Sequence, residues 1–325
     1  MNIAIIGGGK IVPEFLKAVR AVPGLTVCGI WTRRPEAAAA LAQQYVLPCT
    51  YPSYPALLAD PAVDAVYVAL PNALHVPFAD QALCAGKHVL LEKPFAVTEA
   101  GARALADRAA QHGVFLFEMI TNRYCPAFAA AQALLPQLGP IRLASFCYAQ
   151  YSSRYARFCA GVTDPVFDPA LGGGALMDLN VYNLHLAMGL LSAPRAVHYA
   201  PHTVRGIDTS GVLALDMDGV SVTLTAAKDC AAPSGFTLAG ERGCMVSTAA
   251  PNVFDSFTLR LRDAAPQEFS FPVGASRMVD ELTAFRDRAA ARDDRFFRDA
   301  LAHSLRVVSV LETAWRGAGL TLGGE

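Results

Sequence analysis

Short apolar runs recur through the first 117 residues, and helical patterns separate one run from the next. The runs cover residues 3–6, 26–31, 65–69, 88–91 and 114–117. Strands that read as continuous apolar runs are buried on both faces, which is typical of a parallel sheet covered by helices. The sequence therefore predicts a doubly wound α/β domain over residues 1–122.

The pattern changes after residue 122, and a chain of 325 residues is long enough for a second core. A strand is expected over residues 141–151 and a long helix from Ala175 to about Leu191. Farther along, two strands flank Asp218-Gly219, a strong signal for a two-residue hairpin turn. With two closing helices in the tail, residues 123–325 are predicted to form an α+β domain with a mostly antiparallel sheet.

Composition excludes several classes of partner. A net charge of -1 without any basic block argues against binding to nucleic acid or to an anionic membrane. No apolar run approaches membrane-spanning length, and the eight cysteines form no Cys-x-x-Cys pair, so we expect a cytoplasmic protein. Charged residues are only 17% of the chain, against about 25% in typical domains. We therefore expect a homodimer or larger homo-oligomer.

One predicted strand supports this expectation. Ser221, Thr223 and Thr225 alternate with Val222 and Leu224, so one face of the strand is small and polar. Such a face either contacts solvent or packs against the sheet of another subunit.

The triplet Gly7-Gly8-Gly9 follows the first strand and opens a helix. Backbone amides in such a loop can approach a pyrophosphate at the positive helix N-terminus. We predict that a dinucleotide binds there and that Lys10 and Ile11 also contact it. Val12 stands where the usual fingerprint has its third glycine or alanine, a departure that would loosen helix–strand packing.

The end of the second strand indicates which dinucleotide is bound. An acidic residue there reads the 2′-hydroxyl of NAD, whereas an arginine accommodates the 2′-phosphate of NADP. Here the residues are Thr32, Arg33 and Arg34. We predict that all three contact NADP, with NAD as the alternative if the two arginines are only solvated loop charges.

The loop after the third strand lies at the carboxyl edge of the predicted sheet, where ligands of such folds bind. Pro71, Asn72 and His75 are candidate cofactor contacts in this loop. Asn72 either touches the nicotinamide ribose or only caps the helix that follows.

Two further motifs carry groups that handle protons. Glu92-Lys93-Pro94 follows a buried strand, and a cis bond before the proline would aim Lys93 toward a ligand. Glu92 is interpreted as a cofactor contact or as the ion-pair partner of this lysine. On the long helix, Asp178, Tyr182 and His185 stand at i, i+4 and i+7, so they share one face and predict a wet, polar stripe.

These motifs together resemble the Gfo/Idh/MocA family, the group of glucose-fructose oxidoreductase and inositol dehydrogenase. The resemblance includes the Gly7 loop, Lys93 in Glu-Lys-Pro, the Gly-Gly-Gly-Ala-Leu-Met-Asp run and Tyr182, and it covers the whole chain. It implies a Rossmann domain followed by an open-faced sheet domain that often mediates oligomerisation, with Lys93, Asp178 and Tyr182 as catalytic residues. Many members carry His in place of Tyr182. The tyrosine form is similar to glucose-fructose oxidoreductase and the dimeric dihydrodiol dehydrogenases.

The expected activity is hydride transfer between NADP(H) and the carbonyl or hydroxyl carbon of a sugar, polyol, diol or related small molecule. Tyr182 would protonate the carbonyl oxygen, Lys93 would lower the pKa of the phenol, and Asp178 would orient one of the two. No metal is expected, because the histidines show no ligand clustering.

Arg123, Arg154 and His185, together with Asp178, are candidates for substrate contacts. Two alternative functions remain open. One is a non-catalytic regulator that senses dinucleotide on the same fold. The other is a family member that uses tightly bound dinucleotide for transient oxidation during glycoside cleavage.

Overall fold

The computed structural model describes residues 1–321 and divides into two compact units. Unit 1 comprises Met1–Met119 and Gly274–Leu305, and unit 2 comprises Ile120–Val273 and, of the described residues, 306–321. The predicted division at residue 122 lies close to the first boundary. It differs in the C-terminal region, because residues 274–305 belong to unit 1 and not to the second domain.

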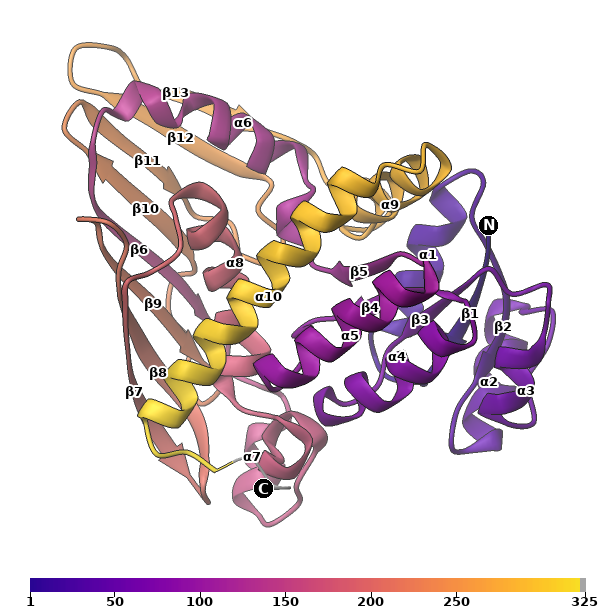
Figure 1. Ribbon diagram of the computed structural model, residues 1–325. Coiled ribbons are helices and arrows are strands. Elements are labelled where there is room, and N and C mark those ends of the chain that lie inside the picture. The colour runs from indigo at the N-terminus through magenta and orange to yellow at the C-terminus, as the bar shows by residue number, and fades with distance from the viewer. Residues whose placement is uncertain (322–325) are drawn as a thin grey trace. The chain divides into compact units, whose positions relative to one another are not determined.

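Unit 1 is built on a five-stranded parallel sheet in the order β2-β1-β3-β4-β5 (Figure 1). The strands are β1 (Asn2–Ile6), β2 (Thr26–Trp31), β3 (Ala65–Val68), β4 (His88–Glu92) and β5 (Leu116–Met119). The helices between them are α1 (Val12–Ala21), α2 (Pro35–Tyr45), α3 (Tyr54–Ala59), α4 (His75–Cys84) and α5 (Glu99–His112). Strands β3 and β5 are buried along their whole length, as a sheet covered on both faces requires. The predicted doubly wound α/β fold is confirmed.

Aromatic contacts explain why part of the C-terminal region joins unit 1. Helix α9 (Val279–Ala290) and the first half of α10 (Asp294–Gly317) pack near β5. The ring of Phe297 stacks on Phe115 at a centroid distance of 4.0 Å, and Phe285 lies 5.6 Å from Phe117. These contacts join residues far apart in sequence, so periodicity in the tail predicts helices but not the unit to which they belong.

Unit 2 contains an eight-stranded sheet in the order β13-β12-β11-β10-β6-β9-β8-β7. The strands are β6 (Ile141–Ala149), β7 (Ala196–Val204), β8 (Ile207–Asp216), β9 (Ser221–Ala227), β10 (Gly235–Gly240), β11 (Gly243–Ser247), β12 (Ser256–Leu261) and β13 (Gln267–Ser270). Strands β6 and β9 pair in parallel and the other neighbours are antiparallel, which confirms the predicted sheet. Asp218 and Gly219 both have positive φ in the predicted two-residue turn between β8 and β9.

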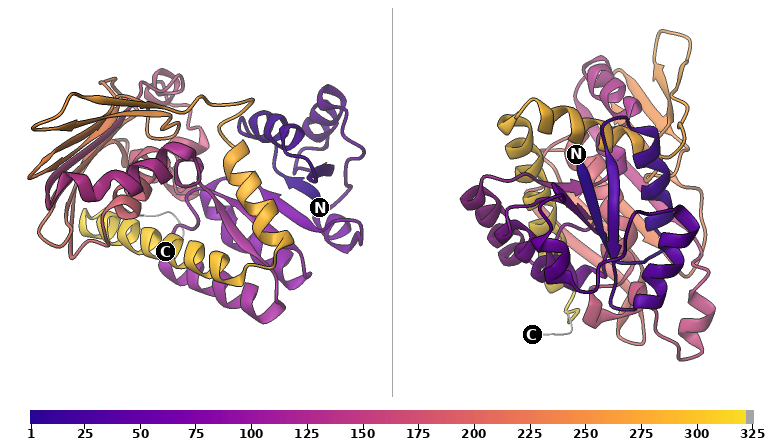
Figure 2. Two further views of the ribbon diagram at one scale, coloured as in Figure 1. Left: turned by 90° about the horizontal axis from the view of Figure 1, so that it is seen from above. Right: turned by 90° about the vertical axis from the view of Figure 1, so that its right-hand side faces the viewer.

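The helices of unit 2 are α6 (Pro126–Leu134), α7 (Tyr155–Cys159) and α8 (Val181–Leu190), together with the end of α10. A π-helical turn over Leu176–Asn180 precedes α8. Single 3-10 turns of unit 2 lie at Thr121–Arg123, Leu135–Leu138, Pro165–Phe167 and Pro169–Leu171, and one in unit 1 lies at Asn72–Leu74. Helices α6 and α8 lie on one side of the large sheet, and no helix of unit 2 within residues 1–321 covers the other side (Figures 1 and 2). Within the same residues, none of the helices combines the length and apolar character needed to cross a bilayer.

Candidate active site

The glycine loop after β1 has a shape that a side chain would prevent. Gly7 has φ +108°, and a Cβ atom there would lie 2.2 Å from the carbonyl oxygen of Ala69. Its amide donates a hydrogen bond to Trp31 O at 2.9 Å. Gly8 and Gly9 are exposed, and α1 begins at the fully buried Val12. The loop therefore leaves exposed backbone beside a helix N-terminus, as pyrophosphate binding requires.

The loop after β2 lies next to the glycine loop and exposes two cations. A Cβ atom on Gly8 would lie 3.3 Å from Thr32 Cγ2. Thr32 Oγ1 donates to Arg34 O at 2.5 Å and accepts from Arg34 N at 3.1 Å, which closes a tight turn. Arg33 and Arg34 are exposed, whereas Thr32 is buried. The threonine thus shapes the loop, and the two guanidinium groups remain accessible to an anionic ligand.

His75, a predicted cofactor contact, is instead part of the interior. It is fully buried, with Nδ1 2.9 Å from Pro94 O and Nε2 2.9 Å from Leu70 O. Burial lowers its pKa. The ring therefore links the loops after β3 and β4 and presents no surface to a ligand, whereas Pro71 and Asn72 are partly exposed at the edge of the sheet.

The Glu-Lys-Pro motif separates into a buried anchor and a partly exposed lysine. Glu92 is buried at the end of β4, and its Oε1 accepts a hydrogen bond from Tyr67 Oη at 2.6 Å. Burial raises the pKa of Glu92, against the smaller opposing effects of Tyr67 and the Lys93 charge. Glu92, predicted as a cofactor contact or as the ion-pair partner of Lys93, is thus a core group bound to Tyr67. The Lys93–Pro94 peptide bond is cis, and Lys93 is partly exposed.

In unit 2, the glycine run and a buried carboxylate fix the start of the helix that carries the site. Asp208 Oδ2, from β8, accepts hydrogen bonds from Leu176 N and Tyr199 Oη, both at 2.7 Å. Gly174 has φ +108°, and a Cβ atom there would lie 2.0 Å from Asp208 Oδ1. Glycine is required at 174 because the carboxylate occupies the space of its side chain.

The helix itself differs from the regular one predicted from Ala175. The π-helical turn includes Asp178, and α8 follows with Tyr182 and His185. Asn180 Nδ2 donates to Leu224 O at 3.1 Å, and Asn183 Nδ2 donates to Thr225 O at 3.0 Å. These two bonds to β9 hold the wide turn against the sheet, and such turns are frequent at functional sites.

Exposure falls along the predicted polar stripe. The side chain of Asp178 is 26% exposed, Tyr182 is 6% exposed and His185 is fully buried. The prediction of a wet face is therefore wrong for His185, which lies in the interior and is not placed to contact a substrate. Tyr148 packs edge-on against Tyr182 with a centroid distance of 5.9 Å.

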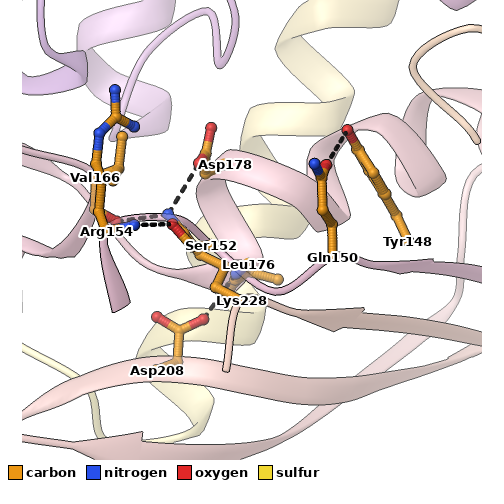
Figure 3. A network of polar contacts seen from close by, with 9 residues as sticks. All are labelled: Tyr148, Gln150, Ser152, Arg154, Val166, Leu176, Asp178, Asp208 and Lys228. Carbon is orange, nitrogen blue, oxygen red and sulfur yellow. Dashed lines mark hydrogen bonds and ion pairs between the residues drawn. The ribbon is translucent and has the colours of Figure 1, made fainter. Parts of the chain in front are cut away.

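Lys228, directly after β9, is a member of the site that the sequence analysis did not single out. Its Nζ donates to Asp178 Oδ2 at 2.8 Å and to Val166 O at 2.7 Å (Figure 3). The predicted partner of Asp178 was Lys93 or Tyr182, whereas the ion pair observed is with Lys228. The only available signal was a lysine at the end of an alternating strand, which is common at the surface of proteins.

The two arginines predicted to contact substrate lie in different places. The guanidinium of Arg123 lies over the Phe128 ring at 4.7 Å and packs against Gly189. Gly189 is two helical turns beyond Tyr182, about 10 Å along the axis, so Arg123 is not beside the Asp178 end of the helix. Arg154 precedes α7, and its backbone amide donates to Ser152 Oγ at 3.3 Å (Figure 3). Over residues 1–321, no group of three His, Cys, Asp or Glu side chains is arranged to hold a metal ion.

Replacing Asp208 with Asn should change how stability depends on pH. Burial raises the pKa of Asp208 from 3.8 to about 6, despite the bonds from Leu176 and Tyr199, which lower it. A raised pKa in the folded state gives stability that is present in full below pH 3.8 and is lost as pH rises through about 6. Relative to the wild type, the Asn variant should gain on the order of 3 kcal/mol of unfolding free energy between about pH 4 and 7.

Urea unfolding at a series of pH values measures this difference. Asp216→Asn, on an exposed position of the same strand, is the control and should show no comparable gain. Parallel stability curves for wild type and Asp208→Asn would contradict the assignment.

Two family models match this chain. Residues 1–119 match the GFO_IDH_MocA model, described as an oxidoreductase family with an NAD-binding Rossmann fold, and residues 129–246 match the GFO/IDH/MocA C-terminal domain.

Individual relatives cover most of the chain. Scyllo-inositol 2-dehydrogenase (NADP(+)) IolU of Bacillus subtilis is 28% identical over 321 residues, which is 98% of both chains. The dTDP-3,4-didehydro-2,6-dideoxy-alpha-D-glucose 3-reductase of Streptomyces violaceoruber is 34% identical over 255 residues, 75% of this chain and 72% of that enzyme. Among solved structures, KijD10, a 3-ketoreductase from Actinomadura kijaniata in complex with NADP and TDP-benzene, has a TM-score of 0.86 and 26% identity, with 98% of this chain and 97% of that chain covered. The resemblance drawn from the motifs is thereby confirmed, and the chain belongs to the GFO/IDH/MocA family of oxidoreductases.

Proposed function

We propose that this protein is an NADP(H)-dependent dehydrogenase or reductase that acts on a carbonyl or hydroxyl carbon of a sugar, polyol or diol. The observation that carries the proposal is the glycine loop, in which Gly7 has no room for a side chain, lying beside the two exposed arginines. The loop suits a pyrophosphate, and the guanidinium groups of Arg33 and Arg34 suit a 2′-phosphate. The relatives support the same class, because their names describe oxidation or reduction at inositol and sugar carbons.

In the proposed reaction, NADPH held by the glycine loop and by Arg33 and Arg34 would supply the hydride that reduces the carbonyl carbon. Tyr182 gives its phenolic proton to the carbonyl oxygen, so the product is an alcohol, and oxidation reverses both transfers. Lys93 is proposed to ease loss of that proton, since an ammonium favours an anion near it. Asp178 accepts a hydrogen bond from the substrate at the exposed end of the helix.

The first prediction of this proposal concerns cofactor choice. Arg33→Asp places a carboxylate at the end of β2 and should weaken NADPH binding by about 10- to 100-fold, the loss of one charge-assisted contact. NADH should bind equally well or better to the variant. Fluorescence titration of both cofactors measures this, with Arg298→Asp, an exposed arginine of α10, as the control. Equal affinity of the unaltered protein for NADPH and NADH would remove the basis for assigning NADP.

The second prediction concerns proton donation. Tyr182→Phe should lower kcat by about 10² to 10⁴, the range for a positioned general acid, while NADPH affinity is unchanged. Tyr148→Phe removes the hydroxyl of a ring that packs edge-on against Tyr182 and should retain near-normal turnover. Lys93→Met should also lose turnover, and the double variant should be far less impaired than the product of the two losses.

Steady-state kinetics requires a substrate, which a screen of sugars, polyols, diols and dicarbonyls with both cofactors would supply. Near-normal turnover of Tyr182→Phe on that substrate would show that the proton donor lies elsewhere. The screen also separates the two alternatives. Dinucleotide binding without turnover of any compound favours a sensing regulator, and copurified dinucleotide that does not exchange favours glycoside cleavage.

The third prediction concerns assembly. The uncovered face of the large sheet carries the exposed apolar side chains of Leu143 and Val212. They lie in register with Ser221 and Thr225 of the small, polar face of β9. We propose that a second copy of the chain covers this face, because a sheet face of small polar side chains with exposed Leu143 and Val212 beside them can pack against another sheet. Light scattering should report more than one subunit, and Thr223→Arg should shift the protein toward monomer. A monodisperse wild-type monomer at micromolar concentration would contradict the proposal.

A further inference from the structure

We propose that Lys228 is a positioning residue, which holds Asp178 as an ionised carboxylate with one oxygen committed to the lysine. Asp178 then acts on the substrate only as a hydrogen-bond acceptor, and proton donation is left to Tyr182. This inference rests on the proposed function and adds a division of roles within unit 2.

The exposure of the two partners shows which one can meet a substrate. The side chain of Lys228 is 3% exposed, whereas that of Asp178 is 26% exposed. A ligand can reach the carboxylate but not the ammonium. Lys228 therefore acts through Asp178 and is not itself a catalytic residue.

The contacts of the Lys228 ammonium fix its direction. An ammonium has three donors and no acceptor. One donor reaches Asp178 Oδ2 at 2.8 Å and another reaches Val166 O at 2.7 Å, while Nζ lies 4.5 Å from the centre of the Phe167 ring. The carbonyl and the aromatic ring hold the ammonium in place. The Asp178 carboxylate is therefore paired with a positive charge whose position is fixed.

The backbone of Lys228 is fixed as well. Its amide donates to Thr209 O at 2.8 Å, and its carbonyl accepts from Ser152 N at 2.8 Å. One residue thus connects β8, the loop after β6 that leads to Arg154, and the π-helical turn that carries Asp178. Movement of the turn away from the sheet would break the ion pair.

Removing the charge of Asp178 and removing the charge of Lys228 should lower the stability of the protein by different amounts. A buried ammonium without its counter-ion is strongly unfavourable, whereas a partly exposed carboxylate can be solvated by water. We expect Asp178→Asn to lower the melting temperature more than Lys228→Met does. Combining the two substitutions should recover much of the loss caused by Asp178→Asn.

The test is a double-mutant cycle on the full-length protein, with kcat, KM, NADPH affinity and melting temperature measured for each variant. Lys228→Met should lower kcat by about 10²-fold, the effect of misplacing a group by about 1 Å, with NADPH affinity unchanged. In the Asp178→Asn background the same substitution should cause no further loss of kcat, because Lys228 acts only through Asp178. Lys87→Met is the matched control: this lysine donates to Asp60 O and Val63 O in unit 1, and its loss should leave kcat unchanged.

Each outcome separates this inference from the proposed function. If Tyr182→Phe loses turnover but Lys228→Met does not, Lys228 is not a positioning residue and the proposed function stands. If Lys228→Met lowers kcat by the same factor in both backgrounds, the lysine has a merely structural role and the inference is wrong.

Two further results cover the remaining cases. If Lys228→Met does not fold, Lys228→Arg, which keeps the positive charge, should retain more turnover than Lys228→Gln, and equal losses would overturn the inference. If no substrate is turned over by the wild type, the proposed function fails. The melting temperatures of the cycle then decide whether Lys228 and Asp178 are coupled at all, and additive changes would overturn the ion pair as a fixed element.

Discussion

The hydrogen bond from Leu176 N to the carboxylate of Asp208 is the interaction on which the π-helical turn of unit 2 depends. It joins the first residue of the π-helical turn to the interior of the sheet, at a point where a helix start has unpaired amides. Without it, the turn that carries Asp178 would have no fixed starting point. Gly174 leaves room for the Asp208 carboxylate, and Tyr199 Oη donates a second hydrogen bond to it.

Buried polar side chains also fix the loops of unit 1. The Oε1 atoms of Glu92 and Glu118 accept from Tyr67 Oη and from Phe95 N, and His75 lies between two backbone carbonyls. These polar groups lie inside the fold and shape the loops at the carboxyl edge of the sheet. Lys93 and the arginines after β2 are among the groups left accessible. Polar residues in a motif thus divide into those that build the site and those that can contact a ligand.

This division marks the limit of what sequence reasoning predicts. The parallel sheet, the glycine loop, the hairpin at Asp218-Gly219 and the family follow from local pattern, because apolar runs, glycine triplets and turn residues act over a few positions. Burial of a polar residue depends on what the rest of the chain places around it. His75 and Glu92 therefore look like ligand contacts in sequence and are interior groups in the structure. Lys228 shows the converse, since its role comes from Asp178, which lies fifty positions earlier in the chain.

The buried position of His75 limits the number of hydrogen bonds that its ring can donate. Both ring nitrogens face carbonyl oxygens, yet a neutral imidazole has only one N–H to donate. Burial lowers the pKa of the ring, so near neutral pH it carries a single proton on its two nitrogens. The proton can sit on Nδ1 and bind the loop that contains Pro94, or on Nε2 and bind the loop that contains Leu70. The tautomer of one interior ring thus determines whether the loop of the lysine motif or the loop after β3 is the more firmly held.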